Sequence, residues 1–157
     1  MKLAEALMLR ADMQQKLAKL RERIAKCAVI DKGDKPAEDP EVLLRQALGI
    51  TDELRSLIVR INATNSRVKM KGKEGGGRTL MEAIAQREAW SANHKTLQAA
   101  IAALDTKLEP YSMREIKRVA VLDAAKLHKQ ADDLAKKVRE LNVVIQETNW
   151  QHELDEE

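Results

Sequence analysis

The sequence Leu57-Ile58-Val59-Arg60-Ile61-Asn62-Ala63-Thr64-Asn65 decides the fold, because a related sequence follows it 84 residues later. The second copy is Leu141-Asn142-Val143-Val144-Ile145-Gln146-Glu147-Thr148-Asn149. The Leu, Ile, Thr and Asn residues match in register, and each copy ends an apolar run with an uncharged polar pair. The two segments therefore share one periodic pattern.

Both segments extend towards the N-terminus as helices with a narrow apolar seam. Apolar or small residues precede each Thr at steps that alternate between three and four. A period of about 3.5 residues is typical of coiled-coil helices, and 84 is a whole number of heptads. The two seams consist of Leu43, Ala47, Ile50, Leu54, Leu57 and Ile61, and of Leu127, Ala131, Leu134, Val138, Leu141 and Ile145.

A second repeat begins the helices that we expect to pair with these two. Residues 3–10, LAEALMLR, match residues 80–87, LMEAIAQR, at an offset of 77 residues, again whole heptads. We interpret the two repeats together as an internal duplication of a helical hairpin. The alternative is that any two heptad helices share such a pattern.

Composition restricts the fold class to helices around an aliphatic core. Phe is absent, aromatic residues make up 2% of the chain and charged residues 34%. Abundant Ala, Glu, Lys, Leu and Arg are typical of long helices, and no alternating β-branched run predicts a strand. A chain of 157 residues can form one domain with a continuous core.

The charges and the single cysteine indicate a cytoplasmic protein without a membrane partner. A net charge of +3 from 28 basic and 25 acidic residues predicts a mixed surface rather than a nucleic-acid-binding one. Cys27 lies on a seam position, so we expect a buried, reduced thiol. No apolar run approaches the ~20 residues of a membrane span. Glu5 and Arg10 within the N-terminal apolar pattern argue against a signal peptide.

We predict an all-α fold of long antiparallel hairpins, a coiled-coil-like four-helix arrangement with a short helix before the last long one. The long helices cover about residues 2–29, 40–66, 79–108 and 123–152, and the short helix covers residues 113–118. Residues 1–157 are then a single helical domain of two duplicated hairpins. The hairpins are residues 1–66 and 79–152, and residues 67–78 form a flexible linker.

The predicted helices have explicit start signals. Asp39 before Pro40 is an N-cap followed by a first-turn proline. Thr79 with Glu82 is a capping box, as is Ser112 with Glu115 for the short helix, and Asp123 can cap the last helix.

Two features of the predicted helices are unfavourable. Gly49 inside the second helix costs about 1 kcal/mol relative to Ala and marks a close helix contact or a bend. The acidic end, residues 153–157, is expected to fray because it is badly placed against the helix dipole.

Polar residues on the seams form the candidate site. Arg10 and Arg87 occupy seam positions, where a charge must be paired and hydrogen-bonded or is very costly. Antiparallel hairpins bring helix starts beside helix ends, so we expect both arginines at one end of the bundle, paired with glutamates across helices. The candidate ligand-binding residues are Glu5, Arg10, Asn62, Thr64, Asn65, Glu82, Arg87, Gln146, Thr148 and Asn149.

Three interpretations of this cluster remain open. It is a buried polar layer that fixes helix register, a pocket for a small anion or polar ligand, or an oligomer interface. Two arginines are suited to clamp an anion, so the second interpretation includes a ligand-binding protein or an enzyme. No reaction follows from the sequence, and we predict no catalytic residue and no cofactor.

Other chemical sites are weaker. His94, His128 and His152 are far apart and no Glu-x-x-His pair occurs, so no metal site is predicted. Residues 75–79, GGGRT, could hold an anion on free backbone amides before a helix, although they lack the Walker pattern and a flexible loop is favoured. Lys69, Lys71, Lys73 and Arg78 could contact phosphates. No aromatic residue is interleaved there for base stacking, so nucleic acid is not an expected partner.

Several motifs along the chain resemble the septicolysin-like family of small bacterial proteins of unknown function. The resemblance implies an all-helical fold and carries no activity. The toxin-like name implies pore formation, which the absence of a membrane-spanning run does not support. The motifs are MKLAEAL (1–7), PAEDP (36–40), INATN (61–65), GRTLMEAIAQR (77–87), SMREIK (112–117) and IQETNW (145–150).

The sequence therefore favours a structural or protein-interaction role as a homo-oligomer. Narrow seams on long helices leave other faces to cover, and additional apolar residues lie off the seam. These residues are Leu9, Ile58, Val121 and Val144.

Overall fold

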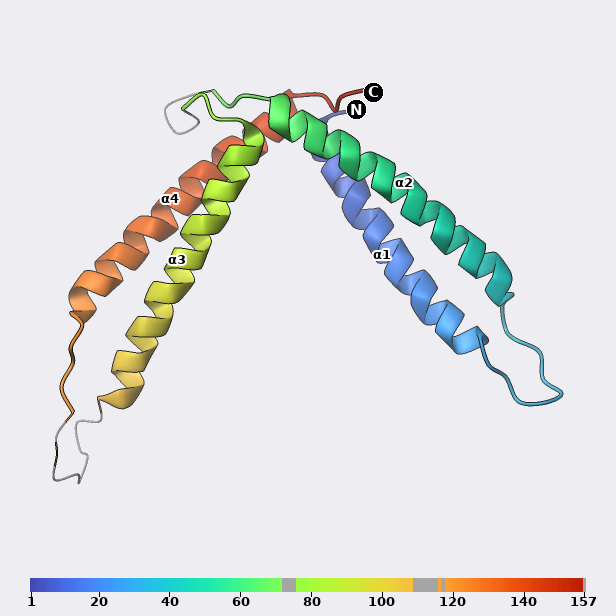
Figure 1. Ribbon diagram of the computed structural model, residues 1–157, viewed down its shortest axis with the longest axis horizontal. Coiled ribbons are helices and arrows are strands. Elements are labelled where there is room, and N and C mark those ends of the chain that lie inside the picture. Colours follow the sequence, from blue (N-terminus) through green and yellow to red (C-terminus); the bar gives the residue numbers. More distant parts are fainter. Residues whose placement is uncertain (72–75, 109–115, 117, 157) are drawn as a thin grey trace. The chain divides into compact units, whose positions relative to one another are not determined.

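The computed structural model describes residues 1–71, 76–108, 116 and 118–156. These residues form an all-α fold in which α1 pairs with α2 and α3 with α4, both antiparallel as predicted (Figure 1). The predicted short helix falls on residues 113–115 and 117, which lie outside the described residues, together with its capping box. The bounds of the helices are α1 Leu3–Cys27, α2 Pro40–Arg67, α3 Leu80–Lys107 and α4 Ala124–Gln151.

The helix starts carry the predicted caps. The side chain of Asp39 caps α2. The Thr79 backbone N–H donates to Glu82 Oε2 at 2.7 Å, and the Glu82 N–H donates to Thr79 Oγ1 at 3.2 Å. The carboxylate of Asp123 accepts a hydrogen bond from the Lys126 N–H at 3.2 Å. These side chains satisfy backbone donors that the first helical turn leaves free.

The chain forms two compact units. The first unit contains residues 1–68 and 148–157, and the second unit contains residues 69–147. The last turn of α4 therefore belongs to the first unit. The aliphatic core of the first unit contains Leu43 and Ala47 of the predicted seam together with Leu17 and Leu20 of α1, and Ile24 and Ile50 pack against them.

A short antiparallel bridge joins the two ends of the chain within the first unit. The Leu3 N–H donates to the His152 carbonyl at 3.0 Å, and the Leu154 N–H donates to the Met1 carbonyl at 2.9 Å. Leu3 is 0% and Leu154 is 4% exposed. The predicted fraying of the acidic end is therefore wrong for residues 153–155, because burial of Leu154 and the bridge fix them.

An equivalent bridge lies within the second unit. The Met70 N–H donates to the Arg78 carbonyl at 2.8 Å, and Lys69 pairs with Thr79. Met70 stands 84 residues before Leu154, and both side chains are buried. The sequence identified residues 67–78 only as a connector, so this pairing was not predicted.

Two single residues complete the comparison with the predicted core. Cys27 is a free, buried cysteine, as predicted. A Cβ built on Gly49 would meet no atom within 4 Å. The interpretation of Gly49 as a close helix contact is therefore wrong, because α2 faces open space at this position.

Candidate functional site

Glu5 and Glu82 serve as helix caps. The Glu5 carboxylate accepts the backbone N–H of the residue before α1 at 2.7 Å, and Glu82 accepts that of Thr79 at 2.7 Å. The backbone hydrogen bond from Thr79, followed by the bond from its hydroxyl, lowers the pKa of the Glu82 carboxyl group. Within each unit, no ion pair joins either glutamate to Arg10 or Arg87 among the described residues, and pairing between the two copies stays a prediction.

Arg10 and Arg87 stand at matching positions but have different neighbours. The Arg87 Nη1–H donates to Asn142 Oδ1 at 3.1 Å. The first unit has Ile58 where the second has Asn142. The Nε of Arg10 is buried and has no hydrogen-bond partner among the described residues. Asn142 therefore accepts a hydrogen bond from Arg87, whereas the Nε–H of Arg10 has no acceptor among the described residues.

Thr64 of α2 forms a hydrogen bond with residue 155, in the segment that follows α4. It is 0% exposed, and its hydroxyl donates to the Arg60 carbonyl at 2.9 Å and accepts from the Asp155 N–H at 3.0 Å. The Arg60 Nε–H donates to the Asp155 carbonyl at 2.9 Å, and Arg67 forms an ion pair with the Asp155 carboxylate. These bonds connect residue 155 to α2, which indicates a structural role for Thr64.

The sequence did not identify Arg60, Arg67 and Asp155 as partners. The one available signal is the spacing of seven residues between the two arginines, which places them on one face of α2. Their shared partner Asp155 lies 95 residues after Arg60, and helical periodicity gives no information about a contact at that distance.

Of the other predicted polar side chains, some are exposed to solvent and some are buried. Asn62 and Gln146 are exposed. Thr148 is 5% and Asn149 is 3% exposed. The Oδ1 atoms of Asn65 and Asn149 are buried without a hydrogen-bond partner among the described residues. Of the ten predicted residues, the first unit contains Glu5, Arg10, Asn62, Thr64, Asn65, Thr148 and Asn149, and the second unit contains Glu82, Arg87 and Gln146.

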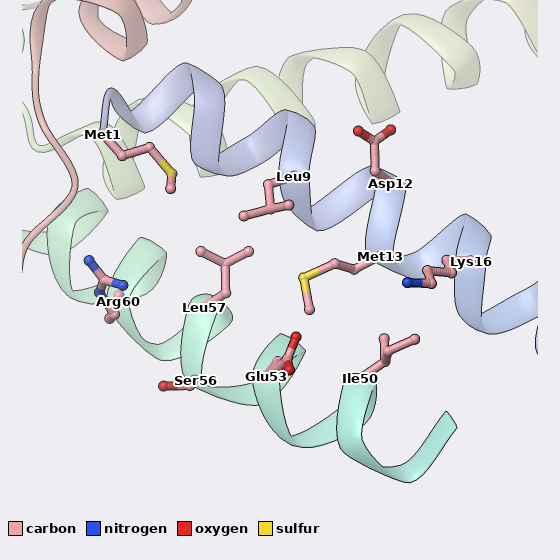
Figure 2. A pocket seen from close by; sticks show the side chains of 10 residues that line it. All are labelled: Met1, Leu9, Asp12, Met13, Lys16, Ile50, Glu53, Ser56, Leu57 and Arg60. Carbon is pink, nitrogen blue, oxygen red and sulfur yellow. The ribbon is translucent and has the colours of Figure 1, made fainter. Parts of the chain in front are cut away.

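A groove between α1 and α2 is a second candidate site, which the sequence did not predict (Figure 2). It has a volume of about 520 Å³ and an apolar lining from Met1, Leu9, Met13, Ile50 and Leu57. Figure 2 shows Leu9, Met13 and Leu57 pointing towards one another across the space between the two helices. Such a volume is within the range of small-molecule sites, and the apolar lining also suits a packed side-chain surface.

Charged residues of both signs surround the apolar lining. Asp12 and Lys16 come from α1, and Glu53 and Arg60 come from α2. In the part of the chain that the structure describes, Asp12, Lys16 and Glu53 form no ion pair. The edges of the groove therefore carry charges that are free to meet a partner.

The second unit repeats this apolar surface only in part. Arg78 replaces Met1 and Gln86 replaces Leu9 at the matching positions. Within the described residues no group of three His, Cys, Asp or Glu side chains could hold a metal ion. No described helix has the length and apolar character needed to cross a bilayer.

The comparisons with known proteins agree with this all-helical architecture. Residues 10–154 match a family of unknown function, DUF6847. A crystal structure of a functionally unknown conserved protein from Corynebacterium diphtheriae is similar over 99% of both chains, with 36% sequence identity and a TM-score of 0.90. A comparison with curated proteins finds no match. The chain belongs to the DUF6847 family, a family of unknown function.

Proposed function

We propose that the protein is a cytoplasmic structural or interaction protein that assembles as a homo-oligomer without catalysing a reaction. One observation carries this proposal: large apolar side chains of the first unit remain between 41% and 61% exposed. Exposed large apolar side chains that gather on one face of a protein indicate a partner, and Met1 and Leu9 border the same groove. The residues concerned are Met1, Met8, Leu9, Leu44 and Leu48.

The architecture explains why these side chains remain in water. Each antiparallel helix pair buries one narrow seam, and covering further apolar area contributes about 25 cal/mol per Å². Burial of the single Cys27 thiol is compatible with the reducing cytoplasm. Association of several chains is the simplest way to cover the remaining apolar faces.

Size-exclusion chromatography with light scattering tests this proposal. We expect a mass that is a multiple of the chain mass at micromolar concentration, and we expect dilution to shift it towards the monomer. A monomer throughout the accessible concentration range would reject self-association.

We also infer that the two hairpins arose by internal duplication. The matched closing bridges support this inference, as do the matched hydrogen bonds from the backbone N–H before each helix to Glu5 and to Glu82. Matched burial of Ile61 at 1% and Ile145 at 2% supports it further. Coincidental heptads account for the seams but give no reason for equivalent bonds beyond the helix ends.

A second candidate function is the binding of a small anion or polar molecule. Three buried polar atoms of the first unit, Arg10 Nε, Asn65 Oδ1 and Asn149 Oδ1, lack hydrogen-bond partners among the described residues. A buried donor or acceptor without a partner costs about 1–3 kcal/mol, so a bound molecule that satisfied these atoms would gain affinity.

Calorimetric titration with inorganic phosphate and with acetate tests the second candidate. We expect Arg10→Gln to remove any binding and Arg139→Gln, at an exposed position of α4, to leave it unchanged. Equal heats for both variants and the wild type would reject Arg10 as a ligand group.

The resemblance to septicolysin-like proteins adds no activity to this proposal, and pore formation is not part of it. Nucleic-acid binding through residues 69–78 is not part of it either. Such binding would show a steep dependence on salt concentration, and we expect no binding to RNA or DNA even at low salt.

A further inference from the structure

We propose that the groove between α1 and α2 is the contact surface between two copies of this chain, which pack face to face around a two-fold axis. This inference rests on the proposed function of self-association and deepens it by naming the surface and the partner. The contact would combine two helix pairs into a four-helix bundle, the common way in which amphipathic helix pairs cover a shared apolar face.

The apolar lining supplies the driving force. Leu9 is 41% and Met1 is 53% exposed, and both border the groove. The buried Leu57 also lines this groove. Figure 2 shows Leu9 and Leu57 projecting into the space between the helices, where side chains of an opposing helix pair could interdigitate with them. Methionines such as Met13 adapt their shape to an opposing surface.

The charges select a second copy of this chain as the occupant. A two-fold contact places the same patch on both sides, so a stable patch must be complementary to itself. Here two acidic residues, Asp12 and Glu53, stand beside two basic ones, Lys16 and Arg60. A patch of one sign would repel its own copy, whereas this mixed patch allows acids of one copy to meet bases of the other.

Arg60 is already oriented for such a contact. Its Nε–H donates to the Asp155 carbonyl at 2.9 Å, which holds the guanidinium at one end of the groove. Because the side chain is held in place before association, less rotamer entropy is lost when a carboxylate meets it.

The available area suits a stable dimer. A helix as long as α2 extends about 40 Å, and a face about 20 Å wide over that length offers about 800 Å². Each partner of a standard-size protein interface buries about 800 Å². The groove itself lies along residues 50–60 of α2, so a dimer of standard size must extend beyond it along the α1–α2 face, and that face needs no contribution from the second unit.

The matching face of the second unit is not an equivalent contact surface. Its groove of about 460 Å³ places Asn93, Thr96, Gln130 and Asp133 beside Leu97 and Leu134. Burial of these polar side chains without hydrogen-bond partners offsets part of the free energy gained by covering the two leucines. The α1–α2 groove is therefore expected to form the contact in preference to the matching face of the second unit.

Leu9→Glu is the main test. In a two-fold contact it buries two carboxylates close together, so we expect the dimer dissociation constant to rise by at least about 100-fold. Val143→Glu is the matched control, because Val143 is 55% exposed on α4 in the second unit. We expect Val143→Glu to dimerise like the wild type in light scattering.

Lys16→Glu is a second variant that cannot act through the core, because Lys16 is exposed. It leaves Arg60 as the only basic residue that borders the groove, together with three carboxylates. We expect weaker dimerisation at about 50 mM salt and recovery at about 1 M salt, where the screening length falls to about 3 Å. Circular dichroism of each variant shows whether its helices remain folded.

The outcomes separate this inference from the proposed function. A dimeric wild type with a monomeric Leu9→Glu and a dimeric Val143→Glu supports the groove. An oligomeric wild type that Leu9→Glu and Lys16→Glu do not disturb overturns the groove and leaves self-association standing. A wild type that remains monomeric overturns both and assigns the groove to another protein or to an apolar ligand.

Discussion

The first and second units share their closing bridges but differ in the side chains around them. Residues 1–3 pair with residues 152–154 in the first unit, and residues 69–70 pair with residues 78–79 in the second. Around the first bridge, Asp155 binds Arg60 and Arg67. The residues at the matching positions of the repeat are Lys71, Val144 and Gln151, which cannot form that ion pair.

The shared residues and the differing residues serve different ends. Features present in both units, such as the caps formed by Glu5 and Glu82 and the buried Leu and Ile residues, hold each unit together. Features present in one unit only, such as Leu9 in the groove and the unsatisfied Arg10, are not needed to hold a helix pair together. The differences therefore identify the surfaces that we propose for partners.

Removal of the most buried isoleucines should produce the largest effect. Ile61 and Ile145 are 1% and 2% exposed at matching positions, so Ile61→Ala and Ile145→Ala are each expected to lower the free energy of unfolding by about 2–5 kcal/mol. Chemical denaturation followed by circular dichroism measures both. Val59→Ala, at a 58% exposed position, is the control. Costs for the two isoleucines that differ several-fold would show that the two cores are not equivalent.

Exchange of Asn142 and Ile58 tests whether the units differ in stability because Arg87 has a hydrogen-bond acceptor and Arg10 has none. Asn142→Ile gives Arg87 the neighbour that Arg10 has, and we expect the free energy of unfolding to fall by about 1–2 kcal/mol because a donor loses its acceptor. Ile58→Asn is the reverse change, which supplies Arg10 with an acceptor and should cost less. If Ile58→Asn were the more damaging of the two, the hydrogen bond of Arg87 would not be the stabilising feature.

Gly49→Ala should stabilise α2. The position is helical and open to solvent, so the methyl group meets no neighbour and the higher helix propensity of Ala is worth about 1 kcal/mol. Thermal unfolding should show a higher midpoint than in the wild type. Gly33→Ala is the opposing control, because Gly33 has a φ of 100° that L-residues rarely adopt, and it should be destabilising.

The smallest expected effect concerns the capping box of α3. The pKa of Glu82 is lowered from its ordinary value of 4.5, so its contribution to stability is present above pH 4.5. That contribution is lost as the pH falls through the lowered pKa. Urea unfolding across the acid range should show a weaker pH dependence for Glu82→Gln than for the wild type. If Glu82→Gln showed the same pH dependence as the wild type, the Glu82 carboxylate would not contribute to the pH dependence of stability.

The helices and their starts were predictable because their signals are local. The seam of α2 contains Leu43, Ala47, Leu57 and Ile61, and all four are buried as their spacing predicts. The capping box of Thr79 needs only two side chains three residues apart. Such patterns depend on helix geometry alone, which is the same in every protein.

The candidate site was less predictable because a seam position does not identify a partner. Arg10 and Arg87 have identical sequence signals, yet only Arg87 has an amide opposite it. The acidic end lacks apolar periodicity, so the burial of Leu154 was missed. The groove was missed as well, because Leu9 and Met13 become a surface only when α2 lies beside them.

The sequence by itself determined four helices, their aliphatic seams and their caps, because these depend on residues within one or two helical turns. Only the tertiary structure decided which polar groups are satisfied and which apolar side chains remain exposed. Thr64 meets Asp155 across 91 residues of chain, and Leu3 meets His152 across nearly the whole sequence. No periodic pattern encodes contacts between segments so far apart, because they depend on how the packed helices bring the chain ends together.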